Sequence, residues 1–142
     1  MNKPSGYRGY CSPNSFGGYQ IPVPMQNTLY REYVQKNGLI FMLSMNELYF
    51  KDCYIQLHEL IDTSQNLSGI LMCSIYMLPK QGSYRTRLLE KCLNYGTEVH
   101  FILDNFILKN RNDMENINYI YKLGNITNLA PKSIEIKKNL KQ

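Results

Sequence analysis

The stretch "LSGILMCSIYMLP" (residues 67–79) holds a continuous apolar run, Ile70–Ile75, bounded by turn-forming residues. Short runs of this kind are typical of parallel strands that are covered on both faces. Similar runs flank it, "LIFMLS" (residues 39–44) before it and "TEVHFILDNFIL" (residues 97–108) after it. The sequence therefore predicts interior parallel strands that include Leu39–Leu43, Ile70–Ile75 and Val99–Leu103.

Amphipathic segments alternate with these runs. Apolar residues recur at helical spacing in residues 25–38 and 53–64, and residues 83–96 form a helical pattern that ends at a glycine. With a first strand at Tyr7–Ser12, strands and helices alternate as in βαβ units. We expect an α/β three-layer sandwich with a mostly parallel sheet of about four to five strands, as in flavodoxin-like folds.

Length and composition predict one domain. The 142 residues suit residues 1–110 as a single α/β domain, residues 111–130 as a C-terminal helix packed on it, and residues 131–142 as a Lys-rich tail. The net charge of +5 permits an anionic partner without choosing one. No apolar stretch is long enough for a membrane span, and the N-terminus lacks a signal core, so we expect a cytoplasmic protein. The cysteine spacing fits no zinc pattern, and we expect no metal and no cofactor.

A long loop follows the first strand, within "GYRGYCSPNSFGGYQIPVPMQN" (residues 6–27). Such loops in compact domains are either functional or disordered. This one leaves the first strand at the carboxyl edge of the sheet, where ligands bind in open α/β folds, which favours function. Polar residues at the ends of the other strands should join it on one rim. The predicted ligand-binding residues are Arg8, Tyr10, Ser12, Gly17, Gly18, Gln20, Gln26, Asn27, Ser44, Ser74 and Tyr76.

The chemistry of this rim suggests an anionic, sugar-type small molecule. Hydroxyl and amide groups suit a sugar, and Arg8 would bind a phosphate or carboxylate in bidentate fashion. Gly17 and Gly18 would either offer backbone N–H groups to a phosphate or form a tight turn. For any single position the alternative remains that strands simply end in polar residues.

Three residues are candidates for catalysis. Asp104 and Glu47 would form an acid–base pair across the rim. Cys11 would be a nucleophile if Arg8 lowered its pKa; the alternative is an inert buried thiol. His100, inside a strand, is interpreted as a core histidine with its hydrogen bonds satisfied. Whether the protein is an enzyme stays open at this stage.

Three motifs resemble the sporadic carbohydrate cluster proteins, which are small bacterial proteins encoded among genes for surface polysaccharide synthesis. They are "GYRGY" (residues 6–10), "FGGYQIPVPMQN" (residues 16–27) and "YMLP" (residues 76–79). The resemblance covers residues 6–108. It implies a role in surface carbohydrate biosynthesis, by binding or modifying a sugar nucleotide or another activated sugar, and it supplies no catalytic residues.

At the level of fold, the chain also resembles the catalytic domain of serine recombinases, which implies a resolvase-like form of the expected sandwich as the alternative to a flavodoxin-like one. That family requires a nucleophilic serine after the first strand, an arginine two positions before it, and an Asp-Arg-x-x-Arg cluster after the third strand. Here Ser12 stands in the place of the arginine and Asn14 in that of the serine, and residues 76–79 lack the cluster. Without guanidinium groups nothing stabilises the charge on a transferring phosphoryl group.

The alternative function is therefore a non-catalytic interaction or regulatory module on a resolvase-like scaffold, which would self-associate as a homo-oligomer. Nucleic acid is not expected as a partner, because no basic helix with base-reading residues is visible.

Overall fold

The computed structural model describes the backbone of residues 6–129 and the side chains of residues 6–124. The Lys-rich tail predicted for residues 131–142 lies outside this range. The strands are β1 (Gly6–Cys11), β2 (Ile40–Asn46), β3 (Gly69–Met72), β4 (Glu98–Phe101) and β5 (Phe106–Leu108). The helices are α1 (Val23–Lys36), α2 (Ile55–Asp62), α3 (Gly82–Tyr95) and α4 (Arg111–Leu129), with short 3-10 turns η1 (Ser64–Asn66) and η2 (Ile75–Met77).

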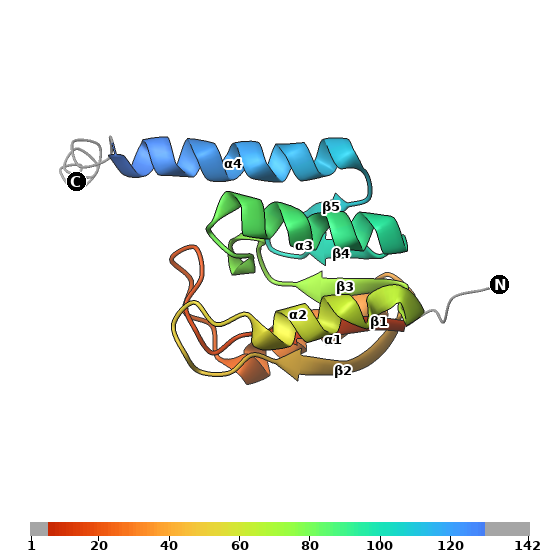
Figure 1. Ribbon diagram of the computed structural model, residues 1–142. Helices are drawn as coiled ribbons and strands as arrows, with labels where there is room; N and C mark the ends of the chain where they lie inside the picture. The colour runs from red at the N-terminus through yellow and green to blue at the C-terminus, as the bar shows by residue number, and fades with distance from the viewer. Residues whose placement is uncertain (1–5, 130–142) are drawn as a thin grey trace.

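One five-stranded sheet carries the fold, in the order β2-β1-β3-β4-β5. Its first three strand pairs are parallel, and β4–β5 is antiparallel. In Figure 1, α2 and α3 lie side by side in front of the sheet and α1 lies behind it, while α4 runs along α3. The predicted α/β class with a mostly parallel sheet is confirmed.

The core lies on both faces of β3. All four of its residues are buried, and Ile70, Leu71 and Met72 are at most 1% exposed. Burying a side chain of this size contributes about 1.5–3 kcal/mol. The helix α1 covers the rear face of the sheet in Figure 1, and its buried residues Gln26, Tyr30 and Val34 are spaced by four. The helical period therefore decides which residues of α1 meet the sheet.

The expectation that residues 39–44 form a strand covered on both faces is wrong. In the observed order β2 lies at the edge of the sheet, and its apolar side chains Ile40 and Leu43 are 58% and 77% exposed. A bulge interrupts its pairing with β1 between Arg8 and Tyr10. The Arg8 guanidinium donates to the Leu43 carbonyl there, at 2.6 Å from Nη1. An apolar run alone cannot distinguish an edge strand from a central one.

The last predicted strand is in fact a hairpin. The strand β4 ends at Phe101, and the chain turns through Asp104 and Asn105 before β5 returns antiparallel to β4. Asn105 adopts a left-handed φ of 53°, which asparagine tolerates in turns. The third strand is also shorter than expected, because Ile75 already belongs to η2.

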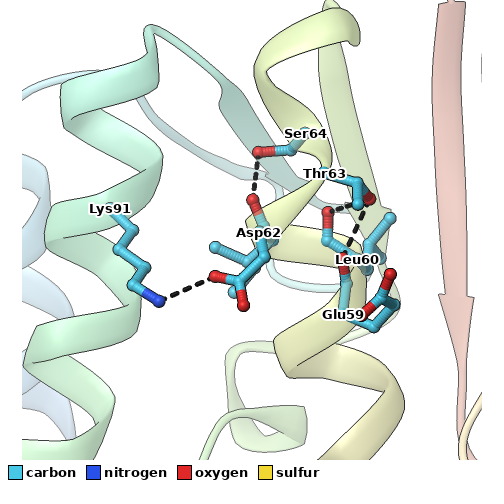
Figure 2. Close-up of polar contacts among 7 residues, drawn as sticks. Glu59, Leu60, Asp62, Thr63, Ser64 and Lys91 are labelled. Carbon is cyan, nitrogen blue, oxygen red and sulfur yellow. Dashed lines mark hydrogen bonds and ion pairs between the residues drawn. The ribbon is translucent and has the colours of Figure 1, made fainter.

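Figure 2 shows where α2 ends beside α3. Lys91 of α3 forms an ion pair with Asp62, at 2.7 Å, with both side chains more than 40% exposed. Exposed pairs of this kind contribute at most about 1 kcal/mol. The Thr63 hydroxyl donates back to the Glu59 carbonyl at 2.9 Å, which satisfies one of the last acceptors of α2. Beneath this surface contact, Leu57, Leu60 and Ile61 of α2 and Leu88 and Leu89 of α3 are buried in the same hydrophobic core.

We predict that Gly9→Ala destabilises the fold. A Cβ at Gly9 would lie 2.5 Å from Cδ2 of Tyr30. That ring is fully buried, and its hydroxyl donates to the Tyr10 carbonyl at 2.5 Å, so it has no room to shift. Overpacking of this kind costs about 1–3 kcal/mol. Urea denaturation should show this loss, whereas Gly82→Ala, whose Cβ meets nothing closer than 3.7 Å, should leave stability nearly unchanged.

Candidate functional site

A cavity of about 1070 Å³ opens at the carboxyl edge of the sheet. Its walls come from the end of β1 with the loop that follows, the β2–α2 loop, the segment around η2, and α4. The predicted residues that line it are Tyr10, Ser12, Gly17, Gly18, Gln20 and Tyr76. The other described lining residues are Pro13, Asn14, Ser15, Phe16, Tyr49, Lys51, Asp52, Cys53, Tyr54, Met77, Lys80, Tyr121 and Gly124. The sequence therefore predicted this rim as the place of a pocket.

Gln26 holds both ends of the loop after β1. This fully buried side chain donates from Nε2 to the carbonyls of Ser12 and Ile21, both at 2.7 Å, and its Oε1 accepts from the Ser12 N–H at 3.0 Å. The hydrogen bonds of its amide to the described residues therefore all go to backbone groups. Gln26 shapes the cavity without lining it.

The remaining predicted rim residues also bind within the protein. The Ser44 hydroxyl donates to Oδ1 of Asn27 at 2.6 Å. The buried Ser74 hydroxyl accepts from the Tyr76 N–H at 3.1 Å and caps η2. Neither these residues nor Arg8 is among the described residues that line the cavity. Arg8 instead sits at the β1–β2 bulge, before the rim.

The two glycines form a tight turn at the tip of the loop. Phe16 and Tyr19 exchange backbone hydrogen bonds of 3.1 and 2.8 Å, and Gly17 and Gly18 between them have φ values of 55° and 83°. A Cβ at Gly17 would lie 2.8 Å from the Tyr76 ring, so only glycine allows the turn to pack this closely. A Cβ at Gly18 would meet nothing within 4 Å, so this side of the turn is open.

Glu47 is buried at the start of the β2–α2 loop and is 4% exposed. Its carboxylate accepts from the Tyr10 hydroxyl at 2.8 Å and from the N–H groups of Gln56 and Leu57, each at 3.1 Å. These N–H groups belong to the first turn of α2, where a negative charge is favoured. This carboxylate therefore ties the start of the β2–α2 loop to β1 and to the first turn of α2.

Asp104 plays a similar part in the β4–β5 turn, where its Oδ2 accepts from the Ile75 N–H at 2.6 Å. No contact joins Asp104 to Glu47 among the described residues, and neither lines the cavity. An acid–base pair of these two carboxylates therefore remains a prediction.

Cys11 is fully buried, and this burial raises the pKa of its thiol to about 12. A thiol with a raised pKa holds little thiolate at neutral pH and is a poor nucleophile. The charge that lowers the pKa of this thiol slightly is that of Arg31, not that of Arg8. The geometry favours the inert buried thiol over the nucleophile.

Five tyrosines are among the described residues that line the cavity: two are anchored, two are open, and Tyr54 packs edge-on against Tyr84 of α3. The Tyr10 hydroxyl is bound to Glu47, and the Tyr121 hydroxyl donates to the carbonyls of Ile75 and Leu78. Burial raises the pKa of both phenols. Tyr49 and Tyr76, by contrast, are 77% and 36% exposed. The anchored rings form the wall, and the open rings are free to meet a ligand.

The cavity is positively charged at its mouth. Lys51 and Lys80 are exposed on its rim and form no ion pair among the described residues, whereas Asp52 is the lone described carboxylate in its lining. Asp52 holds a left-handed φ of 55°. The sequence alone did not identify Lys51 and Asp52 as rim residues, because nothing in "YFKDCY" (residues 49–54) shows that this loop folds over the loop after β1. Asn14 makes that link, donating from Nδ2 to the Phe50 carbonyl at 3.2 Å.

Two searches of the described residues gave negative results. No helix among them is both long enough and apolar enough to cross a membrane. No group of three or more histidine, cysteine or acidic side chains in that part of the chain is placed to hold a metal ion.

Solved structures similar to this chain were found. A resolvase family site-specific recombinase from Streptococcus pneumoniae matches 98% of this chain and 100% of its own, with a TM-score of 0.63 and 11% identity. The N-terminal catalytic domain of TP901-1 integrase matches 96% and 99%, again with a TM-score of 0.63 and 11% identity. The protein has a resolvase-like fold. At this identity the similarity establishes the fold alone.

No family model and no curated protein matches the sequence. The resemblance to the sporadic carbohydrate cluster proteins is therefore a prediction that none of these comparisons supports.

Thiol labelling tests whether Cys11 is an inert buried thiol. In the folded protein at pH 8, iodoacetamide should modify the half-exposed Cys53 first and leave the buried Cys11, Cys73 and Cys92 protected. In urea all four should react at similar rates. Mass spectrometry of the peptides gives the order, and fast modification of Cys11 in the folded state would restore it as a candidate nucleophile.

Replacing Glu47 should destabilise the protein strongly. Glu47→Ala leaves a buried phenol and several N–H groups without an acceptor, at a cost of about 3 kcal/mol or more. Glu47→Gln keeps one carbonyl acceptor and should lose less. The free energy of unfolding measures both variants, with the exposed Glu32→Ala as the matched control that should change little. Equal stability of Glu47→Ala and Glu32→Ala would contradict this role.

Proposed function

We propose that this protein binds an activated sugar, most simply a sugar nucleotide, in the cavity at the carboxyl edge of its sheet, and that it serves bacterial surface carbohydrate biosynthesis. The observation that carries the proposal is the lining itself: open aromatic rings beside two lysines that form no ion pair among the described residues, in a cavity of about 1070 Å³. Ligand pockets are commonly about 300–1,000 Å³, so this one has room for a nucleotide with an attached sugar.

The open tyrosines supply the surface for the uncharged parts of the ligand. Tyr76 lies 5.3 Å from Tyr121 between ring centroids, so its ring is supported from behind while part of it stays exposed. A nucleobase stacks on such a ring for about 1–3 kcal/mol, and this stacking tolerates different bases. A phenol also combines an apolar face with a hydroxyl that can meet a sugar.

The lysines supply the charge for a diphosphate. Lys51 stands on the β2–α2 loop and Lys80 just before α3, so two separate segments place an ammonium group on the rim. A lysine binds phosphate as a point charge and needs no fixed fork geometry. The turn at Gly17 and Gly18 adds backbone N–H groups on the side of the loop after β1. In this proposal the lysines take the role that the sequence alone suggested for Arg8.

The sequence resemblance to the sporadic carbohydrate cluster proteins is an independent reason for choosing a sugar. It rests on residues 6–10, 16–27 and 76–79, and these segments contribute Tyr10, Gly17, Gly18, Gln20 and Tyr76 to the cavity lining. A shared motif at a cavity is more informative about a ligand than a shared motif in the core.

The second candidate is a non-catalytic module on the resolvase-like scaffold. The recombinase resemblance requires an arginine and a serine where this chain has Ser12 and Asn14. Both residues instead form hydrogen bonds that hold the loop after β1. The Ser12 hydroxyl accepts from the Asn14 N–H at 3.1 Å, and the Asn14 amide binds backbone carbonyls. We accordingly propose that this chain does not cleave or rejoin DNA.

A binding screen tests the proposal. UDP-glucose, UDP-N-acetylglucosamine, GDP-mannose and dTDP-glucose are compared with the corresponding free sugars by thermal shift and calorimetry. At least one sugar nucleotide should raise the melting temperature, because a ligand of the folded state stabilises it by mass action. The free sugars should bind more weakly, since they lack the diphosphate.

Variants then locate the site. Lys51→Ala and Lys80→Ala should each weaken binding of that sugar nucleotide about tenfold, which corresponds to ~1.4 kcal/mol. Tyr76→Ala should weaken it while Tyr76→Phe keeps the stacking. Lys36→Ala, an exposed lysine on α1 away from the cavity, is the matched control. Binding of no sugar nucleotide, or binding that all these variants retain, would contradict the proposal.

A further inference from the structure

Three polar side chains form a hydrogen-bonded relay apart from the cavity. Tyr33 of α1 is bonded to His100 of β4, at 2.6 Å from Oη to Nδ1, and His100 is bonded to Glu98 at 2.8 Å from Nε2 to Oε1. None of the three is among the described residues that line the cavity. The relay joins α1 to β4 on the face of the sheet that α1 covers.

The acceptor at one end determines the direction of the relay. A carboxylate only accepts hydrogen bonds, so Nε2 of His100 carries the proton that it donates to Glu98. In the neutral imidazole, Nδ1 then holds a lone pair and must accept from the Tyr33 hydroxyl. The tyrosine oxygen is thus polarised by a base that is itself oriented by a carboxylate, which is the arrangement that activates hydroxyl nucleophiles.

The surroundings hold the imidazole in place and leave the ends of the relay accessible. The ring of Tyr7 packs edge-on against His100, at 5.2 Å between centroids, and that of Tyr33 does so at 5.6 Å. The side chain of His100 is 8% exposed, whereas that of Glu98 is 37% exposed and Tyr33 is half-buried. The base is therefore shielded from water, whereas Tyr33 and Glu98 are each partly exposed; burial raises the pKa of Tyr33, so its hydroxyl depends on a base to react.

We propose that the Tyr33 hydroxyl is an activated nucleophile and a site of covalent acylation by small activated acyl donors, with His100 as its general base and Glu98 as a positioning residue. The assignment goes beyond a core histidine with satisfied hydrogen bonds, because the carboxylate fixes Nδ1 as the basic nitrogen of His100 and that nitrogen faces a hydroxyl. It is independent of the proposed function.

The reaction balances without a further reagent. The Tyr33 oxygen forms a bond to the acyl carbon while the hydroxyl proton passes to Nδ1 of His100. The bond from the acyl carbon to the leaving group then breaks, and the leaving group departs with the bonding electrons and takes the proton from Nδ1. The products are an acyl ester of Tyr33 and the protonated leaving group. Glu98 accepts from Nε2–H throughout and stabilises the transient imidazolium.

Acetylation of the intact protein with N-acetylimidazole tests the proposal, with peptide mass spectrometry to measure the rate at each tyrosine. Exposure alone would make Tyr49 and Tyr119, 77% and 59% exposed, the fastest. With general-base assistance, Tyr33 should be acetylated on the order of tenfold faster than either. An equal or slower rate at Tyr33 would overturn the proposal.

Variants separate the relay from simple exposure. His100→Gln should reduce the rate at Tyr33 to that of an ordinary tyrosine and leave the rate at Tyr49 unchanged. Glu98→Gln should reduce it partly, and Glu98→Asp, which restores a carboxylate, should recover much of the rate. Tyr33→Phe confirms the modified residue, and the exposed Glu115→Gln is the matched control.

Circular dichroism checks that each variant is folded. If His100→Gln does not fold, the comparison of Glu98→Gln with Glu98→Asp decides, because this side chain is partly exposed and should tolerate both changes. A rate at Tyr33 that is the same in the parent, Glu98→Gln and Glu98→Asp would overturn the proposal.

Discussion

Glu47 accepts hydrogen bonds from the end of β1, from its own loop and from the first turn of α2, and the carboxyl edge of the sheet is organised around it. An ionised carboxylate out of water costs several kcal/mol unless it is fully bonded. Here a phenol, several N–H groups and the positive end of a helix offset that cost. Because these donors belong to separate segments, one side chain sets the relative positions of β1, the β2–α2 loop and α2.

Gln26 likewise fixes the position of the loop after β1, which forms another wall of the cavity. Its amide has both donors and an acceptor, so it can bind carbonyls and an N–H group of one loop together. The loop after β1 is thereby tied to α1 at both of its ends, and Phe16 is buried beneath its tip. Ordering that loop in advance lowers the entropic cost of ligand binding. Much of the polar chemistry that looks functional in the sequence therefore maintains the shape of the site.

The predicted and observed folds agree where periodicity carries the information. The run around Ile70 and the helical spacing of Tyr30 and Val34 identify a buried strand and the inner face of a helix. They disagree at β2, because its side chains are as apolar as those of a central strand although Leu43 is largely exposed. The predicted and observed folds also differ at Asp104 and Asn105, because these two residues form a turn in the middle of what looks like one apolar strand. Position in the sheet and local turn geometry both depend on partners elsewhere in the chain.

The same distinction applies to the candidate site. The sequence by itself determined the alternating elements, and hence that the loop after β1 would lie at the carboxyl edge with Tyr10, Ser12 and Tyr76. Only the tertiary structure decided that Lys51 and Lys80 line the cavity and that Arg8 does not, because these residues are placed by segments whose paths are set by long-range hydrogen bonds. The succession of strands and helices along the chain and the helix period are local properties of the sequence, whereas the order of strands in the sheet and the cavity are formed by segments that meet only after folding.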